Sequence, residues 1–184
     1  MGRVIIFPTD TVYGIGSQIF DLEGINKIYA IKKRDKSKPL ACLCASLEQI
    51  KSIAEVSILA EDLINKFLPG PLTIILESTK IVKDKIGYST IGVRIPNNSI
   101  ALDILNENGP MLTTSVNESG NVPLNEYDEI YKEYNHLVDK IYETNTISSN
   151  ISSTVISVIN NEIKILREGQ ITITEIMNNI TPLG

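Results

Sequence analysis

Hydroxyl and carboxylate side chains gather where the first apolar run of the sequence ends. Val4-Ile5-Ile6 is typical of a buried strand. Pro8 ends this strand because proline has no N–H to donate to a neighbouring strand. The next residues carry three hydroxyls and one carboxylate, on Thr9, Thr11, Tyr13 and Asp10. These groups could bind a polar ligand, or they could belong to an ordinary turn marked by Pro8 and by the glycines 14 and 16.

Basic residues crowd the stretch between Lys27 and Lys38, namely Lys27, Lys32, Lys33, Arg34, Lys36 and Lys38. Such a cluster could bind phosphate, which Arg grips with two parallel hydrogen bonds and Lys attracts as a point charge. It could equally be a helix C-terminus whose cations suit the helix dipole. For Lys33 and Lys36 we favour the second interpretation. Lys32 lies seven residues after Ile25 on the apolar stripe, so we favour a functional role for it.

Arg94 lies within a strand pattern over residues 90–95. Alternation places Thr90, Gly92 and Arg94 on one face and the apolar residues on the other. A buried Arg needs an anionic partner. That partner is either an acidic side chain in a structural salt bridge or the carboxylate of a substrate.

Further polar residues follow later strand patterns, namely Thr113, Ser115, Asn117, Ser152, Ser153 and Arg167. At a strand end, Ser and Thr can also simply cap the next turn. The single histidine, His136, has no Ser or Cys nucleophile near it in sequence, and neither a Walker A loop nor G-x-G-x-x-G occurs. Hydroxyls, Lys and Arg together favour a site that positions anionic reactants and stabilises developing charge, without a bond to the protein.

The elements that must position these residues alternate irregularly along the chain. We expect helices over 21–34, 54–68, 98–108 and 126–134 and a short C-terminal helix. We expect strands over 4–6, 40–45, 72–76, 91–95, 111–115, 155–159 and 163–166, the last two paired as a hairpin, and a loop over 143–153. This order predicts an α/β (α+β) fold with a mixed sheet flanked by helices, in a single domain over 1–184.

Composition excludes several classes of protein. The net charge of −5 provides no overall attraction to nucleic acid. The sequence has neither an apolar run near 18 residues nor a signal peptide, so we expect no membrane span and a cytoplasmic location. Cys42 and Cys44 are expected to be reduced core thiols. No protein metal site is expected, because too few ligands cluster.

Seven motifs in order resemble the YrdC-type threonylcarbamoyl-AMP synthase family, in its short single-domain form. They are P-T-D-T-V-Y-G-I-G (8–16), K-x-R with K-P-L (32–40), P-G-P-L-T (69–73), V-R-I-P (93–96), S-x-N-x-S-G (115–120), S-S-T-V (152–155) and L-R-E-G (166–169). The resemblance implies a YrdC/RibB-like fold, an open twisted mixed sheet with a large concave cavity. It also implies a nucleotidyltransferase reaction in which L-threonine, bicarbonate and ATP give threonylcarbamoyl-AMP and pyrophosphate.

The resemblance further implies roles for individual residues. Threonine would be held by Thr11, Arg94, Thr113 and Ser153. ATP would be held by Lys32, Arg34, Lys38, Thr90, Ser115, Asn117 and Arg167, with Lys32 and Arg34 as the catalytic cations. Mg²⁺ is implied as a cofactor carried mainly by the ATP phosphates. The tRNA and the machinery that transfers the threonylcarbamoyl group to it are the implied further partners.

The resemblance has departures and a rival. Leu43 stands where the family often has His, Val116 replaces a usual Ala, and Ser152 replaces a usual Pro. The chain also starts almost at the first motif, without the helix that usually precedes it. The alternative function is a double-stranded RNA or tRNA-binding module of the same fold without synthase activity. A carbamoyl-transfer relative acting on another acceptor is a third interpretation.

Overall fold

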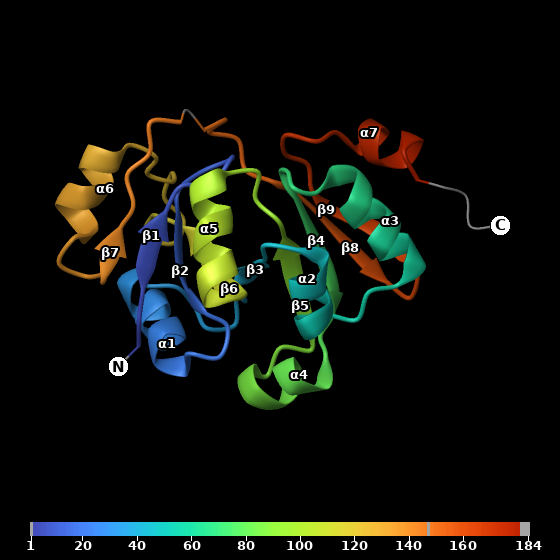
Figure 1. The fold of residues 1–184 in the computed structure, drawn as a ribbon, viewed down its shortest axis with the longest axis horizontal. Helices are drawn as coiled ribbons and strands as arrows, with labels where there is room; N and C mark the ends of the chain where they lie inside the picture. Colours follow the sequence, from blue (N-terminus) through green and yellow to red (C-terminus); the bar gives the residue numbers. More distant parts are fainter. Residues whose placement is uncertain (1, 147, 181–184) are drawn as a thin grey trace.

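The computed structural model describes residues 2–146 and 148–180, which form one mixed sheet with helices packed against it (Figure 1). Within these residues the sheet has nine strands in the order β7-β1-β2-β6-β3-β5-β4-β8-β9. The strands are β1 (Ile5–Phe7), β2 (Gly14–Gln18), β3 (Ala41–Leu43), β4 (Leu72–Glu77), β5 (Thr90–Arg94), β6 (Met111–Ser115), β7 (Lys140–Ile141), β8 (Thr154–Ile159) and β9 (Glu162–Arg167). The helices are α1 (Leu22–Ile31), α2 (Leu47–Ile53), α3 (Ile58–Phe67), α4 (Lys80–Ile86), α5 (Ser99–Asn108), α6 (Tyr127–Tyr134) and α7 (Ile173–Asn178). The expected mixed α/β fold is confirmed.

Strand pairing is mixed, as the irregular order of elements predicts. Strand β1 pairs with β7, β3 with β5 and β4 with β8 in parallel. The other neighbouring pairs are antiparallel. The expected hairpin of β8 and β9 is present, and its turn residues Asn160 and Asn161 have φ of 53° and 58°. Two successive positive φ values match the twist of the flanking strands, and Asn tolerates them well.

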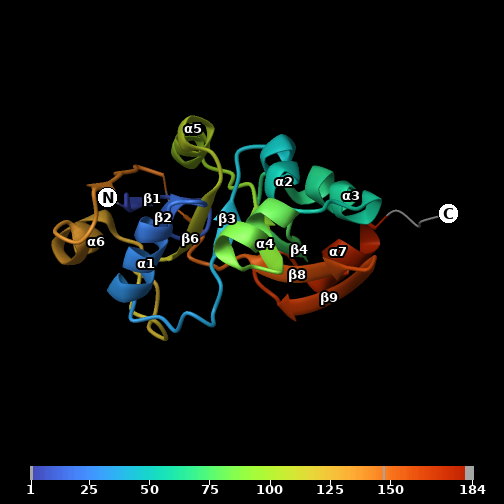
Figure 2. The same ribbon diagram turned by 90° about the horizontal axis from the view of Figure 1, so that it is seen from below.

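The sheet has two ends with separate sets of helices. Helices α1 and α6 lie with β1, β2 and β7 at one end, and α2, α3 and α7 lie with β4, β8 and β9 at the other (Figures 1 and 2). Strand β3 joins the two ends because it pairs with β6 on one side and β5 on the other. Polar residues from both ends therefore meet near the middle of the sheet.

Apolar residues cover both faces of the sheet near β1. Ile6 belongs to the large core cluster that includes Ile28 of α1. Ile5 and Phe7 belong to a smaller cluster with Leu105 of α5. Because successive side chains point to opposite faces, β1 is buried on both sides, as its continuous apolar run predicts.

One predicted helix has the wrong start. Residues 54–68 were expected to be helical throughout, but α3 begins only at Ile58, where the Ser57 side chain accepts a hydrogen bond from the Ala60 amide. Ala54 is extended and forms a β-bridge with Ser78. The bridge partner is distant in sequence, so local periodicity could not show it. Helices α2 and α4 and strands β2 and β7 were not among the predicted elements.

Candidate active site

A cavity of about 370 Å³ lies where the two ends of the sheet meet. This volume lies within the range of small-molecule sites. Most of the predicted site residues line it, namely Thr11, Arg34, Thr90, Arg94, Thr113, Ser115, Ser153 and Arg167. Lys32, Lys38 and Asn117 do not line it. Side chains from segments far apart in the sequence thus converge, as expected.

Sheet register explains why the hydroxyls of β6 face the cavity. In the antiparallel pair of β2 and β6, Gly16 lies opposite Thr113 and Gly14 lies opposite Ser115. A Cβ at Gly16 would lie 2.7 Å from the Thr113 Oγ1 atom, and a Cβ at Gly14 would lie 2.6 Å from its Cγ2 atom. The two glycines are therefore required by the close approach of Thr113.

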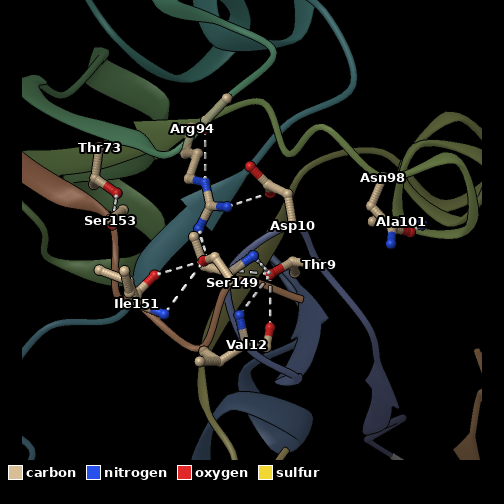
Figure 3. Close-up of polar contacts among 12 residues, drawn as sticks. Thr9, Asp10, Val12, Thr73, Arg94, Asn98, Ala101, Ser149, Ile151 and Ser153 are labelled. Carbon is tan, nitrogen blue, oxygen red and sulfur yellow. Dashed lines mark hydrogen bonds and ion pairs between the residues drawn. The ribbon is translucent and has the colours of Figure 1, made fainter. Parts of the chain in front are cut away.

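Arg94 is buried, with 6% of its surface exposed, and it binds three neighbours. Its Nε donates to the Gly70 carbonyl at 3.0 Å, its Nη1 donates to the Thr11 hydroxyl at 2.9 Å, and its Nη2 forms an ion pair with Asp10 (Figure 3). Burial lowers the pKa of the guanidinium, and the nearby Asp10 carboxylate opposes that shift. The Asp10 contact is the structural salt bridge considered above, although Arg94 also lines the cavity and two of its five N–H groups make no hydrogen bond to the described residues.

Ser153 lies in a second group of contacts, with Thr73 of β4 and Arg167 of β9. Its hydroxyl is 2.8 Å from the Thr73 hydroxyl, and its carbonyl accepts from Arg167 Nη2 at 2.8 Å and from Nε at 3.2 Å (Figure 3 shows the Thr73 contact). Parallel pairing of β4 with β8 brings Thr73 and the start of β8 side by side. Two residues predicted for different substrates, Ser153 and Arg167, thus touch each other.

Lys32 is almost fully buried, with 1% of its surface exposed. Its Nζ donates to the Ser115 carbonyl at 2.5 Å, to the Asn117 carbonyl at 2.8 Å and to the Asn117 Oδ1 atom at 2.6 Å. Burial and the neighbouring Arg34 lower the pKa of Lys32 to about 8. The inward direction predicted from the Ile25 stripe is confirmed. An ammonium has three N–H donors, and these three contacts use all of them. Lys32 therefore holds the end of β6 at Ser115 and the turn that follows it.

The remaining basic residues differ in their position. Arg34 lines the cavity, whereas Lys38 is exposed outside it. Lys33 pairs with Glu118 at 2.6 Å, and Lys27 lies 3.6 Å from Asp139. Lys33 is thus solvated, as predicted, but it lies beyond the end of α1, whose last turn has no basic residue, so its contact is with Glu118 and not with the helix dipole.

Two residues at the site, Thr73 and Asp10, have no role among the predictions from sequence. Thr73 belongs to the P-G-P-L-T motif, and it lies between the apolar residues Leu72 and Ile74 of β4 and lines the cavity. Asp10 was noted but not assigned to Arg94. The apolar surface of Leu43 lines the cavity where the family often has His.

The donor set bears on metal binding. None of the cavity-lining residues is a carboxylate. Over residues 2–146 and 148–180, no group of three or more His, Cys, Asp or Glu side chains could hold a metal ion.

Across the same residues, every helix is too short or too polar to span a membrane. Cys42 and Cys44 are buried free thiols, as expected.

The fold and the cavity define an α/β domain whose cavity is lined by hydroxyl and guanidinium groups. The chain belongs to the Sua5/YciO/YrdC family, since the family model described as "Telomere recombination" matches residues 1–169. The motif-based resemblance is thereby confirmed.

Several curated relatives carry synthase names, and two of them illustrate the similarity. The chain is 36% identical over 175 residues to a putative threonylcarbamoyl-AMP synthase of Methanocaldococcus jannaschii, covering 95% of this chain and 84% of the relative. It is 31% identical to the threonylcarbamoyl-AMP synthase of Pyrococcus abyssi, covering 95% of this chain and 53% of that protein.

Several solved structures share the fold, and two of them illustrate the similarity. Sua5 of P. abyssi complexed with L-threonine has a TM-score of 0.89 at 31% identity, over 97% of this chain and 54% of that one. YciO of E. coli has a TM-score of 0.84 at 29% identity, over 95% of this chain and 87% of that one. The chain thus spans about half of the Sua5 chain and most of the YciO chain.

Proposed function

We propose that the chain is a threonylcarbamoyl-AMP synthase, a nucleotidyltransferase that joins L-threonine, bicarbonate and ATP and releases pyrophosphate. The names of its relatives and the similarity to a threonine-bound structure support the proposal. The observation that carries it is the buried guanidinium of Arg94, which lines the cavity beside the Thr11 hydroxyl. A buried cation of this kind matches the carboxylate of an amino acid.

Threonine would occupy the wall that includes Arg94. Its carboxylate would take the N–H groups of Arg94 that are not used by protein. The hydroxyls of Thr11, Thr113 and Ser153 would orient the rest of the amino acid, with Thr73 holding Ser153 at 2.8 Å. A fixed orientation would direct the threonine amine toward bicarbonate, and the two would form a carbamate with loss of water.

ATP would occupy the side lined by Arg34, Thr90, Ser115 and Arg167. A carbamate oxygen would attack the α-phosphorus as the bond to pyrophosphate breaks, which gives threonylcarbamoyl-AMP. Such a step needs charge neutralisation and alignment more than a protein nucleophile. Arg34 and Arg167 would supply charge directly. Lys32 and Asn117 would act by holding Ser115 in place, and Lys38 would meet ATP from outside the cavity wall.

Mg²⁺ would be held mainly by the ATP phosphates. The cavity fits this arrangement, because hydroxyls and cations line it where a protein-held Mg²⁺ would require carboxylates. When bound, the ion supplies charge neutralisation on the phosphates. The chain's own cations, Arg34 and Arg167, would bind the phosphate oxygens whose charge Mg²⁺ does not neutralise.

The test of the proposal is pyrophosphate release by the pure protein with bicarbonate and Mg-ATP, with and without L-threonine. Release that depends on threonine, together with a product whose mass is that of threonylcarbamoyl-AMP, is the expected result. No threonine-dependent release under conditions in which the P. abyssi enzyme is active would refute it. A filter-binding titration with tRNA tests the alternative function. Tight, salt-sensitive RNA binding without ATP binding would favour the RNA-binding module.

We further propose that the product is passed to a transfer machinery that modifies tRNA, in the cytoplasm. A reactive acyl-adenylate hydrolyses in water, so a nearby acceptor would make use of it before it decays. The reduced thiols of Cys42 and Cys44 are consistent with that compartment. Product transfer to tRNA in a mixture with candidate partners would test it.

A further inference from the structure

The loop between α1 and β3 carries Arg34 and Lys38 but has little secondary structure of its own. Its internal backbone bonds include Lys38 N–H to the Asp35 carbonyl at 3.0 Å. Lys33 has a φ of 49°, so the chain turns away from the helix there. The end of this loop, Pro39 and Leu40, forms part of the cavity wall. Something outside the loop must fix its course for Arg34 to keep one direction.

Two tyrosine hydroxyls hold the end of the loop. The Tyr29 hydroxyl lies 2.9 Å from the Lys38 carbonyl, and the Tyr88 hydroxyl lies 3.1 Å from the Leu40 amide. The two hydroxyls are 3.0 Å apart. Tyr29 comes from α1 and Tyr88 from the segment before β5, so the pair links the two ends of the sheet through this loop.

The chemistry of the partners fixes the direction of every hydrogen bond in this chain of contacts. A carbonyl only accepts and an amide N–H only donates. Tyr29 must therefore donate to Lys38, and Tyr88 must accept from Leu40. Tyr88 then uses its own proton to donate to Tyr29. Burial and the contact with Tyr88 raise the pKa of Tyr29, which keeps its donor proton in place.

Arg34 shares the Lys38 carbonyl with Tyr29 and also bonds to the next residue, Pro39. Its Nε donates to the Lys38 carbonyl at 3.1 Å, and its Nη2 donates to the Pro39 carbonyl at 3.2 Å. The guanidinium lines the cavity while it is bonded to the segment that the tyrosines hold. A displacement of that segment would move Arg34 with it.

We propose that Tyr29 and Tyr88 are positioning residues that hold residues 38–40 and thereby aim Arg34 at the ATP side of the cavity. The inference rests on the proposed function, because it takes the ligand at Arg34 to be a nucleotide. The hydroxyls do not touch Arg94 or Ser153. Their loss should therefore affect one substrate and spare the other.

The experiment compares Tyr88→Phe and Tyr29→Phe with Tyr131→Phe, whose hydroxyl is on the exposed part of α6. Dissociation constants for Mg-ATP and for L-threonine are measured separately by calorimetry, with Tm as a measure of folding. Each substitution removes a part-buried hydrogen bond, and a loss of about 1–2 kcal/mol changes an equilibrium by about 5- to 30-fold. We expect the dissociation constant for Mg-ATP to rise by about that factor in the Tyr29 and Tyr88 variants. Their dissociation constants for L-threonine should stay within about twofold of wild type, and the Tyr131 variant should be unchanged for both ligands.

The double variant sharpens the result. The two hydroxyls belong to one hydrogen-bond network. The double variant, Tyr29→Phe combined with Tyr88→Phe, should therefore weaken Mg-ATP binding by much less than the product of the two single fold-changes. Unchanged Mg-ATP binding in both single variants, or equal weakening of both ligands, would overturn the inference. Wild-type protein that binds neither ligand would instead refute the proposed function, so the two failures are distinguishable.

Discussion

Two buried cations, Arg94 and Lys32, differ in what their charged groups contact. Arg94 is paired with an acid, Asp10, and lines the cavity. Lys32 faces the oxygens of Ser115 and Asn117 and does not line the cavity. Carbonyl and amide oxygens satisfy its ammonium without neutralising it, and its pKa is lowered to about 8. The comparison shows that burial and charge alone do not define a role, because one cation faces the cavity and the other fixes a turn behind its wall.

Replacing Arg94 should have the largest effect. We expect Arg94→Ala to weaken L-threonine binding by about 100-fold or more, because charged hydrogen bonds contribute about 1.5–3 kcal/mol each. The affinity for Mg-ATP should change by less than about threefold. Calorimetry with each ligand checks this. Asp10 would also be left without its partner, so Tm must be measured alongside.

Lys32→Ala should show the opposite preference. Loss of the ammonium leaves the Ser115 and Asn117 oxygens without their donor, and the turn that presents Ser115 loosens. We expect Mg-ATP binding to weaken by about 30-fold while the affinity for threonine is nearly unchanged. If both substitutions weakened both ligands equally, the division of the cavity into two sides would be wrong.

Asp10→Asn tests the ion pair without removing Arg94. Breaking a largely buried pair leaves a charge without compensation, so we expect the free energy of unfolding to fall by about 2 kcal/mol, below the 3–5 kcal/mol typical of full burial. Urea unfolding at pH 7 measures it. A matched Asp35→Asn change in the exposed loop should have little effect, and equal effects of the two would show that the Arg94 pair contributes no more than a surface contact.

The smallest effect is a pH dependence that distinguishes the two cations. The Lys32 ammonium is charged below its pKa of about 8 and neutral above it. A neutral amine has only two donors for three oxygens, so Mg-ATP affinity should decline by a few-fold as the pH rises through about 8. Titrations between pH 6.5 and 9.5 measure this, with Lys32→Met as the variant that should lack the dependence. The Arg94 guanidinium stays charged over this range, so threonine binding should show no change near pH 8 beyond the titration of threonine's own amine.

Sequence patterns located the site residues better than their partners. The alternation of Thr90, Gly92 and Arg94 and the seven-residue spacing from Ile25 to Lys32 correctly gave the faces on which these side chains lie. The pairing of Arg94 with Asp10 and of Ser153 with Thr73 depends on which distant strands become neighbours. Local periodicity carries no information about that. The late start of α3 has the same cause, because Ala54 is held by a bridge to Ser78.

The parallel pairing of β8 with β4 has a consequence for synthesis of the chain. Leu72 lies opposite Thr154, so a strand that contributes to the cavity lining leaves the ribosome long after its neighbour. A nascent chain ending before Ser153 would already contain Thr11 and Arg94 but could not close the pocket around an amino acid. Because a molecule that binds only the finished fold stabilises it by mass action, the cellular substrate would favour chains whose last strands have docked.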